Sequence, residues 1–294
     1  MGKHEKRIGY VLYGLLLTLG LLYYRFPSDA FRDYLQTSAA RVNPGIVLSI
    51  ERVSPTYHLG IRLLGTQVSH KGILRGHLFK AENLLIRPDM WSLFQGKWKL
   101  LFDGLAYRGS IKGSAKFVER GIKAPFKLSV ELKEIHIDDY ENLRGLIGRH
   151  VKGGMSAVIS YSGSYDALMN GAGEARLTLS NGQVELLQPI LNLKAIDFRE
   201  IGAKMVLRNG RIELTQAELK GPNMQGTLSG VVMLNRDFSK SSLELKGTME
   251  PLGDFYKSLA GNLGETKFFK QRLKGGKISF MIQGAVGQPQ IRFI

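Results

Sequence analysis

Histidines are the residues of this chain best suited to metal binding or proton transfer, and their spacing fits neither role. None falls in an HExxH or HxH arrangement, and only His70 and His77 lie near each other. The nearest carboxylate, Glu82, follows His77 by five residues, so the local sequence offers no third metal ligand. We therefore predict no metal site. The six histidines are His4, His58, His70, His77, His136 and His150.

Candidate nucleophiles and acids are equally sparse. The absence of Cys excludes thiolate metal sites, disulfides and cysteine nucleophiles. Ser162 lies among aromatic residues but outside any Gly-x-Ser-x-Gly motif, and we expect a turn there. Asp138 and Asp139 are adjacent, and we expect them to stabilise a helix N-terminus instead of forming a catalytic pair. The sequence therefore predicts a protein that is not an enzyme and uses no cofactor.

The charge balance is strongly basic. The chain has 294 residues, 41 Lys plus Arg against 25 Asp plus Glu, a net charge of +16, and 44% hydrophobic residues, which is enough for a sizeable core. Residues 62–133 alone hold 14 basic and 5 acidic residues, a net +9. Such a surface suits nucleic acid, anionic lipid headgroups or acidic proteins, or is simply a solvated face. The membrane anchor that the amino terminus predicts leads us to exclude nucleic acid.

The amino terminus, residues 1–27, reads as a cytoplasmic tail followed by a transmembrane anchor. Residues 8–24 are 17 residues without a charge, about 25 Å of helix at ~1.5 Å per residue. Lys3, Lys6 and Arg7 should hold this end in the cytoplasm, which places the rest of the chain outside it. A cleaved signal peptide is the alternative, but no small-x-small cleavage site follows Tyr24. The leucines of the expected span are Leu15, Leu16, Leu17, Leu19, Leu21 and Leu22.

The remainder of the chain changes from helical to strand periodicity. Apolar residues at helical spacing predict a short amphipathic helix at the membrane exit, within residues 28–44. Residues 45–294 repeat with a period of two, for example over 126–132, 211–215 and 242–246, which predicts an antiparallel sheet with one wet face. Two Asn-Gly pairs, at 181–182 and 209–210, predict hairpin turns. Helical spacing also predicts helices over 138–151 and 252–273, and the fold class is mainly β with two or three flanking helices.

The alternating strands define an apolar face for which few covering helices are available. We expect this face to curl into a groove that could hold acyl chains, unless helices fill it. Trp91 and Trp98 are expected to be buried at a corner of the sheet. The residues predicted to line the groove are Val184, Leu186, Ile212, Leu214, Leu228, Leu243, Leu245, Ile278, Phe280 and Ile282.

The layout resembles the type II secretion system protein N (GspN) family over nearly the whole chain. The resemblance rests on a basic tail and one span followed by Phe26-Pro27, the segment Trp91-Ser92-Leu93-Phe94-Gln95-Gly96 after Pro88, a strand pair over 104–116, a helix before Gly153-Gly154, and the closing residues 284–289. That family looks like a short relative of the AsmA-like proteins. Those are anchored in the inner membrane, lie in the periplasm and carry long curved sheets with an apolar groove.

The resemblance implies a single-pass protein of the bacterial inner membrane with its bulk, residues 45–294, in the periplasm. The function it implies is that of a non-enzymatic accessory component of the type II secretion system, with other secretion components as partners. The alternative is an AsmA-like lipid-binding or lipid-transfer protein, with phospholipid acyl chains as ligands in the apolar groove. The degenerate glycine and hydrophobic patterns do not separate the two.

Overall fold

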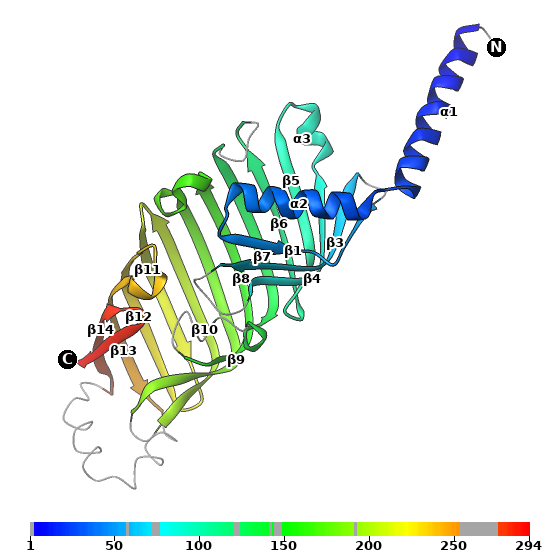
Figure 1. The fold of residues 1–294 in the computed structure, drawn as a ribbon. Helices are drawn as coiled ribbons and strands as arrows, with labels where there is room; N and C mark the ends of the chain where they lie inside the picture. Colours follow the sequence, from blue (N-terminus) through cyan, green and yellow to red (C-terminus); the bar gives the residue numbers. More distant parts are fainter. Residues whose placement is uncertain are drawn as a thin grey trace.

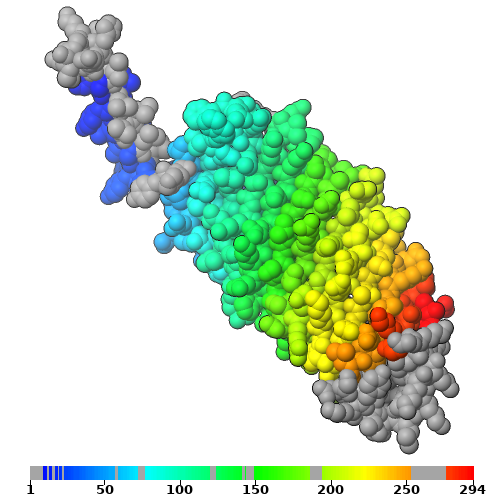
Figure 2. All heavy atoms as spheres, turned by 180° about the vertical axis from the view of Figure 1, so that it is seen from behind, coloured from blue at the N-terminus to red at the C-terminus, as the bar shows by residue number. Residues whose placement is uncertain are grey.

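A single antiparallel sheet of 15 strands makes up most of the molecule (Figure 1). The computed structural model describes residues 3–56, 59–71, 77–119, 124–140, 143, 149–190, 193–252 and 276–294. From β3 onward, each strand pairs with the next one along the chain, while β1 and β2 both pair with β3. The sheet therefore extends in sequence order from one end of an elongated body to the other (Figure 2). The predicted mainly β, antiparallel class is confirmed.

The strands lengthen towards the middle of the sheet. They are β1 (Ile46–Ser49), β2 (Arg52–Thr56), β3 (Gly60–His70), β4 (His77–Pro88), β5 (Trp98–Ala106), β6 (Gly109–Phe117), β7 (Phe126–His136), β8 (Val151–Gly163), β9 (Ala172–Ile190), β10 (Leu193–Arg208), β11 (Arg211–Lys220), β12 (Met224–Met233), β13 (Ser242–Pro251), β14 (Ile278–Ala285) and β15 (Gln288–Phe293). The helices whose bounds lie in the described ranges are α1 (Lys3–Tyr24), α2 (Ser28–Val42), α3 (Met90–Phe94) and the 3-10 turns η1 (Ile137–Asp139), η2 (Tyr165–Asn170) and η3 (Phe238–Lys240).

The register of the ladders places apolar residues and glycines opposite one another in a row that crosses 14 strands, which we name the central row. Side chains alternate between the two faces of a strand, so every member of the row faces the same side, the groove face. The members, in spatial order, are Val53, Leu63, Leu84, Gly104, Ile111, Leu132, Ala157, Leu177, Ala203, Ala217, Leu228, Gly247, Phe280 and Phe293.

The opposite face is polar, and part of it pairs opposite charges across neighbouring strands. Beside the central row on that face, Asp103 lies opposite Lys112, and Lys112 lies opposite Glu131. Cross-strand pairs of opposite charge stabilise a sheet by about 0.2–1 kcal/mol each. The predicted wet face is therefore present, and it is the outer side of the sheet.

Bulges keep the groove face apolar where the sequence pattern changes phase. In β11, Leu214 lies opposite Gly230 and Ala217 lies opposite Leu228, so two residues of β11 face the single Ser229. The extra residue returns Ala217 to the same face as Leu214. A similar shift in β7 keeps Leu132 and Ile135 on one face.

One of the two predicted Asn-Gly hairpins is wrong. Asn209 and Gly210 form the turn between β10 and β11, with Arg208 paired to Arg211 and φ values of 48° and 72°, as a type I′ hairpin requires. Asn181, in contrast, lies inside the 19-residue strand β9. The ladder between β8 and β9 shifts register there, so its φ of 48° belongs to a bulge, and pairing on both sides keeps the strand continuous.

The structure describes only the ends of the helix predicted over 138–151, with Leu143 helical between them, and almost none of the helix predicted over 252–273. Asp138 and Asp139 lie in the 3-10 turn η1, and Val151 begins β8, so the helix cannot extend to residue 151 as expected. Gly153 and Gly154 lie within β8 instead of ending a helix. Residues 141–142, 144–148 and 253–275 lie outside the described residues.

The helix α1 projects away from the sheet (Figures 1 and 2). Tyr10, Val11, Leu17 and Leu21 are each more than half exposed. Within the described ranges, no helix meets the combined length and apolarity that crossing a membrane demands. The side chains of Leu15, Leu16, Leu19 and Leu22 are outside the described part.

The helix α2 occupies the range predicted to be helical and covers the groove face at the β1–β3 end (Figure 1). Ile50, Val53 and Leu63 form the core there, each at most 5% exposed. Phe31 and Leu35 from α2 pack against this core. The groove face is thus closed at its amino-terminal end.

Replacing Leu63 tests this closure. Leu63→Ala should lower the free energy of unfolding by about 2–5 kcal/mol, because Leu63 is 5% exposed and its removal leaves a cavity beneath α2. Arg62→Ala, one residue away on the polar face, should stay within about 0.5 kcal/mol. Urea unfolding followed by circular dichroism measures both, and similar losses for the two variants would contradict the assignment of faces.

Candidate functional site

The strands β9 to β15 enclose an apolar cavity of about 350 Å³ on the groove face. Residues from seven consecutive strands line it, so strands distant in the sheet order face one another across it. A flat sheet cannot bring β9 and β15 to one cavity, and the sheet must curl there. The apolar lining residues are Val184, Ile196, Ile201, Ala217, Leu219, Met224, Leu228, Met249, Phe280, Ile282, Ile291 and Phe293.

A glycine makes room for the largest side chain of the cavity. Gly247 lies opposite both Leu228 and Phe280 in the central row. A Cβ atom at Gly247 would lie 2.6 Å from Cζ of Phe280 and 3.1 Å from Cδ1 of Leu228. The ring of Phe280 therefore lies over the backbone of β13, a position that only glycine permits.

The ten predicted groove residues divide into three groups. Val184, Leu228, Phe280 and Ile282 line the cavity. Ile212, Leu214, Leu243, Leu245 and Ile278 lie on the same face but outside the lining, and of these Leu245 and Ile278 are buried at 7% and 1% exposure. The side chain of Leu186 is outside the described part.

The sequence reasoning missed eight other apolar lining residues, half of them on β10 and β15. Ile196 and Ile201 both line the cavity, although they are five residues apart on β10. Strict period-two counting puts them on opposite faces. Ile291 and Phe293 do alternate, and a search for short strands at the carboxyl end could have found them.

Among the described lining residues, one cation borders this apolar cavity. Arg149, just before β8, is partly buried, and this burial lowers the pKa of its guanidinium. Among the residues the structure describes, Arg149 has no carboxylate partner. Glu218 also borders the cavity and accepts a hydrogen bond from Gln216. A partly desolvated, unpaired guanidinium favours an anionic group beside it.

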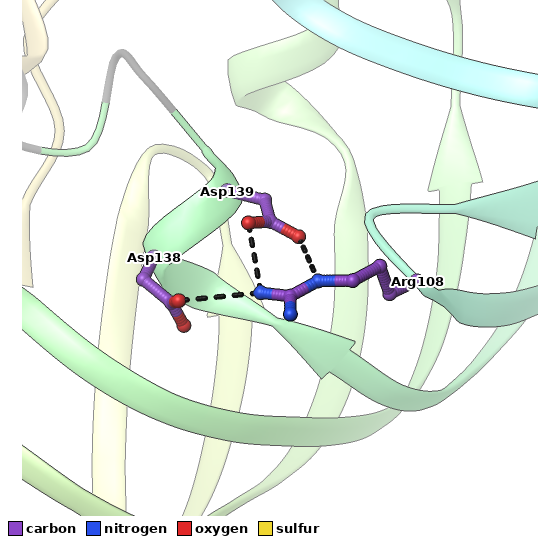
Figure 3. A network of polar contacts seen from close by, with 3 residues as sticks. All are labelled: Arg108, Asp138 and Asp139. Atoms are coloured by element: carbon purple, nitrogen blue, oxygen red, sulfur yellow. Dashed lines mark hydrogen bonds and ion pairs between the residues drawn. The ribbon is translucent and has the colours of Figure 1, made fainter.

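The acidic pair singled out in the sequence has a structural partner (Figure 3). Arg108 donates from Nε to Oδ2 of Asp139 at 2.6 Å and from Nη2 to Oδ1 of Asp139 at 2.9 Å and Oδ2 of Asp138 at 3.3 Å. The hydrogen bond to Asp139 is the main cause of a raised pKa for Arg108. The pair thus joins the β5–β6 turn to the first turn of η1.

The other candidate residues also lie in structural roles. His77 Nδ1 is 3.0 Å from Oγ of Ser69, across the β3–β4 ladder. Ser162 lies in β8 instead of the expected turn. In the described part of the chain, no group of three His, Asp or Glu residues could hold a metal ion. The expected burial of the tryptophans is wrong, since Trp91 is 74% exposed and Trp98 is 42% exposed.

No protein-family model, curated protein or solved structure matches this chain. The resemblance to the GspN family and the expected place in a secretion apparatus therefore stay predictions. The curled sheet and its apolar cavity are the observations on which a function can be argued.

Proposed function

We propose that this protein binds the acyl chains of lipids along the groove face of its sheet, in a groove of the AsmA-like kind. The unbroken central row is the observation that carries the proposal. It presents only apolar residues and glycines across 14 strands, while the opposite face carries the charges. A linear apolar ligand matches such a surface along its length.

The groove face is longer than its described helical cover. Thirteen strand spacings of roughly 4.8 Å give an arc of about 62 Å, and α2 packs at the β1–β3 end. An acyl chain reaches about 15 Å, half the hydrocarbon thickness of a bilayer, so the face has room for several chains. Each buried methylene contributes about 0.8 kcal/mol, which makes long chains effective ligands.

Arg149 sets the orientation in which an amphiphilic ligand binds. The cavity of β9–β15 holds apolar chain ends, and the guanidinium at its border pairs with an anionic headgroup such as a phosphate. The preferred ligand is therefore an anionic phospholipid or another anionic amphiphile.

The helix α1 is the membrane anchor in this proposal. Lys3, Lys6 and Arg7 lie at its start and favour the cytoplasm, and the 17 uncharged residues 8–24 follow them. The sheet then lies in the periplasm beside the inner membrane, which is the source of its lipid. A periplasmic sheet meets no nucleic acid.

Docking to other components of a type II secretion system is the second candidate function. The strand β15 is the last strand of the sheet and pairs only with β14 in the described order. An open edge of this kind can accept a strand from a partner protein. Lipid binding is preferred because docking at the edge would use only the six residues of β15. An apolar groove gives a reason for the apolar row along the whole sheet.

A pair of neighbouring substitutions on β14 tests lipid binding. Ile282→Lys puts an ammonium group into the apolar cavity and should remove most of the co-purifying lipid, because an unpaired charge resists burial. Gln283→Lys is the matched control, since Gln283 is exposed on the polar face opposite Glu244. Mass spectrometry of lipids extracted from the purified full chain gives the readout, with circular dichroism to verify folding.

Equal lipid in both folded variants, or no lipid in the parent protein, would defeat the groove hypothesis. Docking to secretion partners would then become the preferred function.

A second substitution tests the headgroup. Arg149→Gln should shift the bound lipids from anionic towards zwitterionic species, because the cation at the cavity border is lost. Arg149→Lys keeps the charge and should preserve most of the anionic preference. The ratio of phosphatidylglycerol to phosphatidylethanolamine in the extract measures the change, and an unchanged ratio in Arg149→Gln would rule out this role.

A fusion experiment tests the anchor and its orientation. Alkaline phosphatase joined after Ile294 should be active in the periplasm, and the intact mass should retain residues 8–24. Replacing Lys3, Lys6 and Arg7 with Gln should reduce this activity by weakening the topology signal. A mature amino terminus beyond Tyr24 would show a cleaved signal peptide instead.

A further inference from the structure

The short helix α3 presents large apolar side chains to solvent. Trp91 is 74% exposed and Phe94 is 83% exposed, with Met90 at 41% and Trp98 at 42% beside them. The segment lies between β4 and β5 and projects from one long edge of the sheet (Figure 1). Scattered exposed leucines are ordinary, but several neighbouring large side chains of this kind mark a contact surface.

The segment is held in place by its own polar contacts. Asp89 caps α3, accepting from the backbone N–H of Ser92 at 3.4 Å, and forms a 2.9 Å ion pair with Nζ of Lys99. That hydrogen bond to Lys99 is the main cause of the lowered pKa of Asp89. The backbone N–H of Lys97 donates to the carbonyl of Ser92 at 2.8 Å. The aromatic side chains are therefore presented by a braced turn.

A row of basic side chains starts at the base of α3, where Lys99 pairs with Asp89. Lys99, Lys116 and Lys127 lie opposite one another on β5, β6 and β7, and the side chains of Lys116 and Lys127 are exposed. With Arg208, these three lysines border a shallow hollow of about 510 Å³, whose described lining has one carboxylate, Glu174. Positive charge beside exposed aromatic groups matches the interface of a bilayer that contains anionic lipid.

We infer that the segment Met90 to Trp98 is a membrane contact separate from α1, with Trp91 and Phe94 inserted at headgroup depth and the exposed Lys116 and Lys127 on anionic headgroups. Tryptophan suits this depth because its ring is apolar and its N–H remains hydrogen-bonded. The contact would bring the β4–β5 edge of the sheet against the bilayer. It does not depend on what the groove holds.

The experiment uses the fact that Trp91 and Trp98 are the two tryptophans of the whole chain. The full chain is added to vesicles of phosphatidylcholine and phosphatidylglycerol, either unmodified or with brominated acyl chains. We expect a blue shift of the tryptophan emission, quenching by the brominated chains and loss of quenching by aqueous iodide. Trp98→Phe leaves Trp91 as the sole reporter and should give the larger fractional response.

Matched variants separate this contact from the anchor. Phe94→Ser should reduce the blue shift and the bromine quenching, because insertion loses one of its two most exposed aromatic side chains. Leu105→Ser is the control, since Leu105 is 52% exposed on β5 near the end of that strand farther along the chain from α3. Replacing phosphatidylglycerol with phosphatidylcholine should weaken the response in the parent protein.

Emission that is unaffected by brominated chains and fully open to iodide would overturn the inference and point to a protein partner for α3. An equal response in Phe94→Ser and the parent protein would overturn it as well. Either result leaves the lipid content of the groove, and its own test, unaffected.

Discussion

The structure depends on each strand keeping its apolar side chains on the same face of the sheet. A one-residue slip in any ladder would turn all later apolar residues to the polar face, because the side-chain period of a strand is two. The central row shows that the phase is kept from Val53 to Phe293 across 14 strands. Where the sequence falls out of phase, as at Leu214 and Ala217, an extra residue in a bulge restores it.

The sheet has one apolar face, and in the described part no second sheet packs on it. It therefore has little of the core that two packed layers would form. The deepest burial at its amino-terminal end lies beneath α2, around Val53 and Leu63. Farther along, curling of the sheet brings Val184 of β9 and Phe293 of β15 to one cavity. Stability along most of the described sheet therefore depends on ladder hydrogen bonds and cross-strand pairs.

Much of the sheet could be predicted from alternation, and the remainder depended on pairing that a local pattern does not contain. The runs at 126–132, 211–215 and 242–246 lie in β7, β11 and β13. Asn181 failed as a turn because β8 and β10 pair with β9 on both sides of it. The prediction that Trp91 is buried was wrong because Trp91 lies in the connection between β4 and β5, where it is exposed. Arg149 gave no local signal, since strands distant in sequence build the cavity that it borders.

Because the strands lie in the order of the sequence, the sheet can become longer or shorter without a new arrangement of the strands that remain. Each strand from β3 onward contacts its immediate neighbours, so the sheet behaves as a one-dimensional array. Inserting or deleting a hairpin of two strands would alter the groove by about 9.6 Å, with strand direction and facing preserved on both sides of the change. A single added strand would reverse the direction of all later ones. Adding strands two at a time is therefore the change that lengthens the groove and keeps the direction of every later strand.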